Sequence, residues 1–192
     1  MKRLVPPLLL AVAAGAAPAQ HVEHGYLALA AGPSSVQTQC LSASSNSDRN
    51  SCGLASSGGR ALAGLFFQPG LAAEIVVLDF GRGVETRGAD EQRVRLRALG
   101  LGTAAVMELG GGLAFAVRAG VAGTRIHRES TVASRRSEVV KSSAELYGGV
   151  SGLFRVNREL AIEFSVDALG LGDSTYRRDG GVMATLGLSL RY

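Results

Sequence analysis

The last eleven residues of the chain, Val182-Met-Ala-Thr-Leu-Gly-Leu-Ser-Leu-Arg-Tyr192, alternate between two kinds of side chain. Successive side chains of an extended strand point to opposite faces. One face of this stretch is apolar, and the other is polar or small. Such a strand is typical of a transmembrane β-barrel, with lipid outside and a polar lumen inside. An edge strand of a soluble sandwich alternates in the same way, so the rest of the chain must decide. The apolar face carries Val182, Ala184, Leu186, Leu188, Leu190 and Tyr192.

The first nineteen residues have the pattern of an export signal. Lys2 and Arg3 precede an apolar run over residues 4–14, and Ala17-Pro18-Ala19 provides a small-residue cleavage site before Gln20. The run is short for a helix that spans a bilayer. We therefore expect a signal peptide at 1–19, export through the Sec pathway, and one domain at 20–192.

Composition narrows the class of protein further. The formal net charge of +4 falls to +2 without Lys2 and Arg3, which argues against a nucleic-acid partner. Hydrophobic residues make up 46% of the chain, yet no apolar run after the signal reaches the ~18 residues of a membrane helix. No zinc pattern or nucleotide motif occurs, so we expect no metal or cofactor.

Eight alternating segments can be counted along the chain, with connections that are long and short in turn. The short connections are Pro69-Gly70, Gly110-Gly111-Gly112 and residues 156–158, and the long ones cover about 32–59, 81–91, 125–140 and 172–181. In membrane barrels, long outer loops alternate with short periplasmic turns in the same way. We predict an all-β fold, an eight-stranded antiparallel up-and-down transmembrane β-barrel. The segments are about 25–31, 60–68, 71–80, 92–107, 113–124, 143–152, 160–168 and 182–192.

Charged residues gather on one face of the later segments, and we assign that face to the lumen. Side chains fill the interior of an eight-stranded barrel, and buried charges must be paired. The sequence therefore predicts a lumen plugged by salt bridges, not an open pore. The predicted network contains Arg93, Arg95, Arg97, Arg118, Glu145, Glu163, Asp167 and Arg191.

The chain has two cysteines, Cys40 and Cys52, separated by a polar, turn-forming segment. An exported protein meets an oxidising periplasm. We expect a disulfide between them, which contributes ~3 kcal/mol on the chain-entropy model.

Two features of residues 125–140 raise other functions. His127 and Ser130 could belong to an acyl-transfer triad, with Glu129 or Glu145 as the acid. Their spacing of three places the two side chains on opposite faces of a strand, so we expect no enzyme. A lipid A-modifying acyl hydrolase using His127/Ser130 and a small-solute porin are the alternative functions. Arginines suit phosphate recognition, or they form a solvated loop; they are Arg125, Arg128, Arg135 and Arg136.

The segment Gly64-Leu-Phe-Phe-Gln-Pro-Gly-Leu-Ala-Ala-Glu-Ile-Val-Val-Leu-Asp-Phe-Gly81 resembles the strand–turn–strand of OmpA-like, opacity-type outer-membrane barrels, with Glu74 and Asp79-Phe80-Gly81 as matches. Val77 stands where that family often has Tyr. Some members carry a cysteine pair in the first outer loop, where Cys40 and Cys52 lie. The ending Leu188-Ser-Leu190-Arg-Tyr192 is similar to the signal read by the barrel-assembly machinery.

This resemblance implies a surface protein of the Gram-negative outer membrane, with a structural or surface-interaction role in envelope integrity or in adhesion through outer loops. The expected partners are outer-membrane lipid, lipopolysaccharide, the barrel-assembly machinery and host surface molecules. We expect a monomer.

Overall fold

The computed structural model describes residues 25–39, 51–87, 90–132, 135–170 and 180–192. The predicted signal peptide and Cys40 lie outside these ranges, and so does the side chain of Cys52, so the disulfide stays a prediction. No helix of the described part is long and apolar enough to cross a membrane. Eight strands form the structure: β1 (Gly25–Gln39), β2 (Ser51–Gln68), β3 (Leu71–Arg87), β4 (Asp90–Gly110), β5 (Leu113–Val132), β6 (Arg135–Arg155), β7 (Leu160–Leu169) and β8 (Gly180–Arg191).

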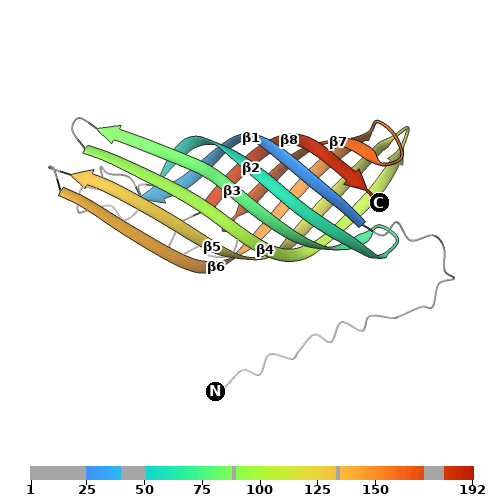
Figure 1. Ribbon diagram of the computed structural model, residues 1–192, viewed down its shortest axis with the longest axis horizontal. Helices are drawn as coiled ribbons and strands as arrows, with labels where there is room; N and C mark the ends of the chain where they lie inside the picture. Colours follow the sequence, from blue (N-terminus) through green and yellow to red (C-terminus); the bar gives the residue numbers. More distant parts are fainter. Residues whose placement is uncertain (1–24, 40–50, 88–89, 133–134, 171–179) are drawn as a thin grey trace, which may run out of the picture.

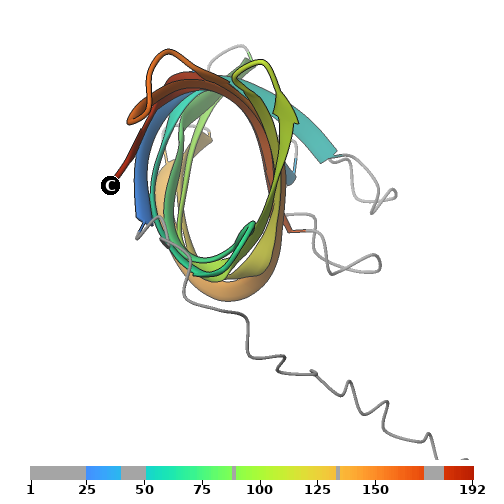
Figure 2. The ribbon, with the colours of Figure 1, turned by 90° about the vertical axis from the view of Figure 1, so that its right-hand side faces the viewer.

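The strands pair antiparallel in sequence order, and β1 also pairs with β8, so the sheet closes into a barrel. Figure 1 shows the tilted strands of the barrel, and Figure 2 shows the ring of strands from one end. The cross-strand partners of Tyr26, followed through all eight strands, lead back to β1 at Val36, ten residues farther along. This stagger fixes the strand tilt and a narrow interior. The predicted eight-stranded up-and-down barrel is confirmed.

Alternation along each strand separates an outer apolar face from an inner one. In β8, Leu186, Leu188 and Leu190 are exposed, while Met183 and Thr185 are buried inside the barrel. The exposed apolar residues of all eight strands form a continuous outer surface, which we call the apolar belt. It includes Leu27, Leu29, Leu65, Ile75, Val77, Leu99, Leu101, Val117, Val121, Leu146, Val150, Phe164, Leu186, Leu188 and Leu190.

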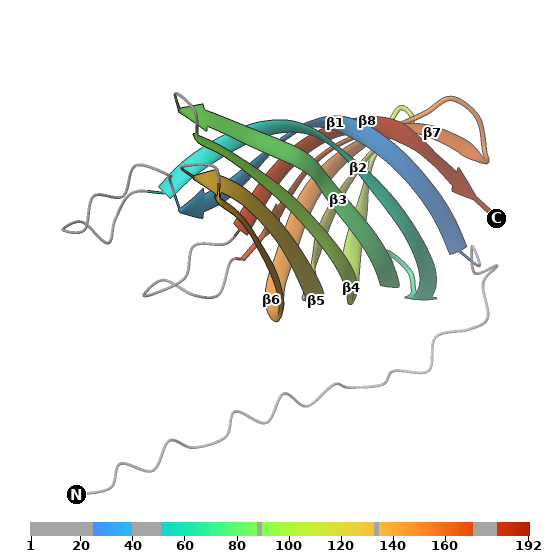
Figure 3. The same ribbon diagram turned by 60° about the vertical axis from the view of Figure 1, so that its left-hand side comes forward.

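The strands extend farther than the sequence predicts. Cross-strand pairing of β3 with β4 continues to Arg87 and Asp90, and that of β5 with β6 continues to Val132 and Arg135. The expected long loops at 81–91 and 125–140 are therefore wrong, because most of these residues belong to strands. Figure 1 shows the two hairpins at the left, projecting beyond the ends of β1 and β2, and Figure 3 brings this end of the barrel forward. We call this the hairpin end, and the opposite end, with the start of β1, the end of β8 and the short turns, the turn end.

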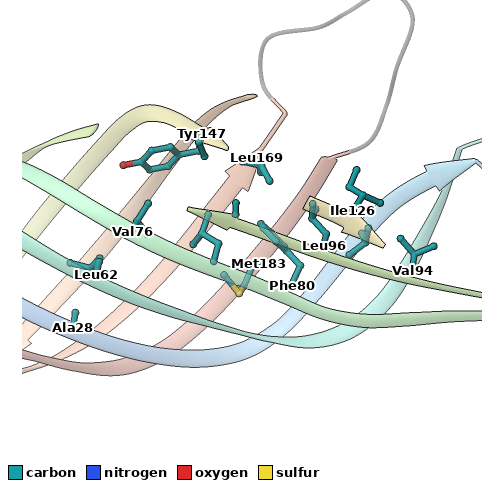
Figure 4. Packing of buried hydrophobic residues seen from close by; sticks show 14 of the residues in the cluster. Ala28, Leu62, Val76, Phe80, Val94, Leu96, Ile126, Tyr147, Leu169 and Met183 are labelled. Atoms are coloured by element: carbon teal, nitrogen blue, oxygen red, sulfur yellow. The ribbon is translucent and has the colours of Figure 1, made fainter. Parts of the chain in front are cut away.

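Apolar side chains fill the interior toward the hairpin end, where charged residues were expected. Leu78 and Phe80 of β3 and Val94 and Leu96 of β4 are almost fully buried there, beside Met183 of β8. Figure 4 shows Phe80, Val94, Leu96 and Met183 pointing into the barrel from different strands. The inner face of β4 is thus its Val94–Leu96 face, and the salt-bridged plug is only one layer of a mixed interior. A smaller apolar cluster, Ala114, Ala116, Leu153 and Ala161, packs near the turn end.

Two tyrosines occupy the interior because glycines on neighbouring strands leave room for their rings. The ring of Tyr26 lies over Gly64, and the ring of Tyr147 lies over Gly102 and Gly120. A Cβ atom at Gly120 would overlap both the Tyr147 ring and the Leu101 carbonyl oxygen. Because a backbone atom blocks this position, no side-chain rotation can relieve the overlap.

We predict that Gly120→Val destabilises the barrel by about 2–3 kcal/mol, at the upper end of overpacking effects. Gly123→Val on the same strand is the matched control, because a Cβ there meets only the Leu99 carbonyl oxygen at 3.9 Å. Urea titration of the protein in lipid vesicles, followed by gel mobility without boiling, measures the difference. Equal midpoints for the two variants would contradict this packing.

Candidate functional site

Five buried charged side chains meet across the middle of the barrel, and we call them the lumen ion network. Arg60 comes from β2, Glu74 from β3, Arg118 from β5, and Glu163 and Asp167 from β7. Each of these five side chains is at most 3% exposed. The network therefore joins strands from opposite walls of the barrel.

Arg60 bridges both acids of β7. Its Nη2 lies 2.7 Å from Oε1 of Glu163, and its Nη1 lies 3.1 Å from Oδ2 of Asp167. Ser165, between the two acids on the same inner face, donates a 3.0 Å hydrogen bond to Asp167 Oδ2. Arg60 and Ser165 thus hold the two carboxylates of β7 in place independently of Arg118.

Arg118 faces the same acids from the other side. Its Nη2 lies 3.1 Å from Oε1 of Glu163, and its Nε lies 3.4 Å from Oε2 of Glu74. The same Nη2 donates to Ser151 Oγ at 3.1 Å. Tyr26 donates a hydrogen bond to Oε1 of Glu74. Arg118 is therefore the common partner that links β3 to β6 and β7.

This arrangement leaves three carboxylates facing two guanidinium groups. Each arginine therefore pairs with more than one acid. A buried charge that loses its partner costs about 3–5 kcal/mol, so the loss of either arginine would affect several carboxylates. The hydroxyls of Tyr26, Ser151 and Ser165 contribute further to satisfying the charged atoms. The lumen ion network holds the walls together electrostatically and fills the space through which solutes would pass.

The structure brings three of the predicted lumen residues together and separates the others. Arg118, Glu163 and Asp167 belong to the lumen ion network. Glu145 lies on the inner face of β6 and makes no ion pair within the described ranges. Arg191 is at the turn end, where its Nη1 lies 3.5 Å from Oε1 of Glu108.

Glu108 at the rim also accepts a hydrogen bond from Arg155. The expected carboxylate partner of Arg191 is therefore found at the mouth of the barrel and not in its interior.

The placement of Arg95 and Arg97 in the lumen is wrong. Both lie on the outer face of β4, where their side chains are 38% and 56% exposed. Arg93 shares that face. Residues 92–98 alternate between an apolar face and a charged face, so the pattern alone does not say which face lies inside. The apolar face fills the barrel because this part of the strand lies beyond the apolar belt, where the outer face meets no hydrocarbon.

The two remaining members of the lumen ion network, Arg60 and Glu74, were missed. Residues on both sides of Arg60 in the chain are apolar or small, so alternation does not reveal its face. Glu74 and Asp79 have opposite parity on one strand, so one of the two acids must face outward. The short turn at Pro69-Gly70 pairs Gly64 with Glu74. Because Arg60 and Gly64 have the same parity on β2, this register puts Arg60 and Glu74 on one face of the sheet, and it is the signal that could have identified them.

Arginines beyond the apolar belt form a second candidate site on the outside of β3, β4 and β5. We call Arg82, Arg93, Arg95, Arg97 and Arg125 the outer arginine cluster. All five, with Val94, His127 and Glu129, line a cavity of about 290 Å³. The cavity lies at the hairpin end, on the outer wall.

Asp79 organises the centre of this cluster. Its Oδ2 accepts hydrogen bonds from Arg95 Nη2 at 2.8 Å and from Arg97 Nε at 2.9 Å. The backbone N–H of Gly81 donates to its Oδ1 at 2.9 Å. Gly81 has a φ of +75°, which glycine adopts readily, and a shift of register follows Asp79. This bend aims the carboxylate at the two arginines.

His127 and Ser130 do not form the pair that an acyl hydrolase needs. His127 lies on the outer face of β5, where its Nε2 is 3.2 Å from Oε1 of Glu129 and 3.3 Å from Oε1 of Glu138. Ser130 has the opposite parity, and its Oγ is 2.7 Å from Ser137 Oγ. The two residues have separate partners, in agreement with their spacing.

The predicted assembly signal ends the closing strand. Leu188, Leu190 and Tyr192 are exposed on the outer face. Tyr192 exchanges two backbone hydrogen bonds of 3.0 Å with Gly25, at the start of β1. The start of β1 and the last residue of the chain are thus part of the seam that closes the barrel.

No family model matches the chain, and no curated protein matches it in sequence. Solved structures do share its fold. Neisserial surface protein A has a TM-score of 0.63 at 10% identity, over 87% of this chain and 97% of that one. Ail of Yersinia pestis, in complex with the heparin analogue sucrose octasulfate, has 0.56 at 10%, over 88% and 99%. The N-terminal barrel domain of Pseudomonas aeruginosa OprF has 0.56 at 15%, over 90% and 100%. At these identities the likeness establishes the fold that the OmpA-like resemblance implied.

Removing Arg118 tests the lumen ion network. We predict that Arg118→Met lowers the free energy of unfolding by about 3–5 kcal/mol, because it leaves buried carboxylates short of a cation. The double variant Arg118→Met/Glu74→Gln should recover part of that loss. Urea unfolding in vesicles can be followed by circular dichroism, since the chain has no Trp.

The control is Arg158→Met, an exposed arginine in the β6–β7 turn, which should change stability by less than about 0.5 kcal/mol. A loss for Arg118→Met as small as that of the control would show that the network is not a stabilising element.

Proposed function

We propose that this chain is a monomeric outer-membrane β-barrel protein of a Gram-negative bacterium, with a structural or surface-interaction role in the cell envelope. The observation that carries the proposal is a closed ring of strands that is apolar outside and filled inside. A soluble barrel places its apolar face inside and its polar face outside, whereas this one exposes leucines, valines and phenylalanines around its whole circumference.

The height of the apolar belt fits a bilayer. On β4 the exposed apolar residues run from Leu109 to Leu99. Ten residues at about 3.4 Å each, tilted by about 40°, span ~25 Å, which is the height of the outer apolar band in outer-membrane barrels. The absence of free sheet edges, given by the β1–β8 pairing, meets the other requirement of a strand in lipid.

A closed lumen supports a structural role over transport. The lumen ion network and the apolar cluster around Phe80 and Met183 occupy successive layers of the interior. The alternative of a small-solute porin would require both layers to move. A large and stable conductance in planar bilayers would favour that alternative.

The two projecting hairpins supply the surface for interaction. β4, β5 and β6 continue well past the apolar belt and carry exposed charged residues, among them Arg93 and Arg136. The Yersinia pestis neighbour was solved with a heparin analogue, so a barrel of this fold offers a surface to a polyanion. We propose host surface molecules and lipopolysaccharide as partners of this end.

Three further proposals complete the function. Export uses the Sec pathway, with residues 1–19 as the signal. The barrel-assembly machinery reads Leu188, Leu190 and Tyr192, which are exposed at the closing seam. The protein is not an enzyme, a proposal supported by the separate partners of His127 and Ser130.

Cell fractionation tests the proposed function. When the full chain is expressed in a Gram-negative cell, we expect it in the outer-membrane fraction, with faster gel mobility before boiling than after, because a closed barrel resists detergent. A truncated chain that lacks β8 cannot close the ring and should lose this mobility shift. Recovery of the full chain in the soluble periplasmic fraction would contradict the proposal.

A further inference from the structure

The outer arginine cluster brings like charges directly opposite one another on an exposed face. Arg97 pairs in register with Arg125 across β4 and β5, and Arg95 pairs with Arg82 across β3 and β4. Like charges at such positions destabilise a sheet. Two such pairs side by side are an unfavourable arrangement unless an anion lies between them.

The carboxylates of the protein do not supply that anion for the whole cluster. Asp79 pairs with Arg95 and Arg97, and Glu91 pairs with Arg93 at 2.6 Å. Arg82 and Arg125 are exposed, and neither has an ion pair in the part of the chain that the structure describes. They flank the Asp79 group on β3 and β5, so two cations that have no ion-pair partner among the described residues border the cavity.

The position of the cluster relative to the apolar belt identifies the level at which an anion would bind. Val77 of β3 and Leu99 of β4 are paired and exposed, and they are the last apolar residues of the belt on these strands before Asp79 and Arg97. Arg97 lies two residues beyond Leu99, ~7 Å along the strand. The guanidinium groups therefore begin where hydrocarbon ends and lipid headgroups start.

We propose that the outer arginine cluster binds a phosphorylated sugar headgroup of the glycolipid in the outer leaflet, that is, the lipid A part of lipopolysaccharide. This inference rests on the proposed outer-membrane location. Arg82 and Arg125 contact the phosphate, since charge-assisted guanidinium–phosphate bonds are strong and directional. Asp79 is a positioning residue, because it holds Arg95 and Arg97 toward the same cavity without touching the ligand.

The size and position of the cavity fit such a ligand. Its volume of about 290 Å³ is near the lower limit of small-molecule sites, which suits one phosphorylated sugar more than a whole oligosaccharide. The cavity lies on the outer wall and not in the lumen, so a lipid can enter it from the membrane with its acyl chains against the apolar belt. The pair Arg82 and Arg125 therefore determines phosphate binding and not folding.

The test uses the full-length folded protein in detergent micelles and measures binding of purified lipid A that carries its phosphates. We expect the double variant Arg82→Ala/Arg125→Ala to bind it at least about tenfold more weakly than the wild type, as the loss of charge-assisted bonds implies. Arg158→Ala, at the turn end, is the control and should bind like the wild type. Unchanged gel mobility before boiling shows that each variant is folded.

Two further arms identify the ligand. Lipid A stripped of its phosphates should bind the wild type as weakly as the double variant binds intact lipid A, and the two losses should not add. Equal affinity of the wild type for both lipids, or of both proteins for intact lipid A, would overturn the proposal. Phosphatidylglycerol that binds with the same dependence on Arg82 and Arg125 would also overturn it, in favour of any anionic headgroup. These outcomes are separable from cell fractionation, which tests the location alone.

Discussion

The pairing of Arg118 with carboxylates from both walls is the interaction on which the barrel depends. An eight-stranded ring with this stagger leaves a narrow interior that must be filled and cannot hydrate freely. Glu74, Glu163 and Asp167 can be buried there only while Arg60 and Arg118 face them. A strand that slipped by one residue would move every side chain to the other face and strand these charges in lipid.

The same constraint explains the outside of the molecule. Once β3 points Glu74 inward, Val77 and Asp79 must point outward, and register then places Arg97 beside Asp79 and Arg125 beside Arg97. The apolar belt and the outer arginine cluster are thus consecutive parts of one face. Interior charge, membrane contact and the polar surface beyond the membrane follow from a single choice of phase on each strand.

Sequence alternation predicts the number of strands, their antiparallel order and the faces of β5 to β8, because both lipid and lumen select side chains there. It fails on residues 93–98 of β4, where the outer face has left the hydrocarbon and arginines are tolerated on the outside. The apolar Val94 and Leu96 then pack inside, and the simple rule of apolar outward reverses. Arg60 was missed for a related reason, since small apolar residues surround it on both faces. The hairpins were predicted as loops because polar residues occupy strands that stand in water.

The phase of β4 changes its surroundings at the membrane boundary, and a spin-label scan tests this phase most directly. Labels are placed singly at positions 93 to 101 of the full chain in lipid vesicles, with Cys40 and Cys52 replaced. We expect labels at 99 and 101 to collide with dissolved oxygen and labels at 93 and 95 to collide with a water-soluble nickel complex, with the preference reversing near 97. Labels at 93 and 95 that are shielded from both reagents, with oxygen contact at 94 and 96, would contradict it.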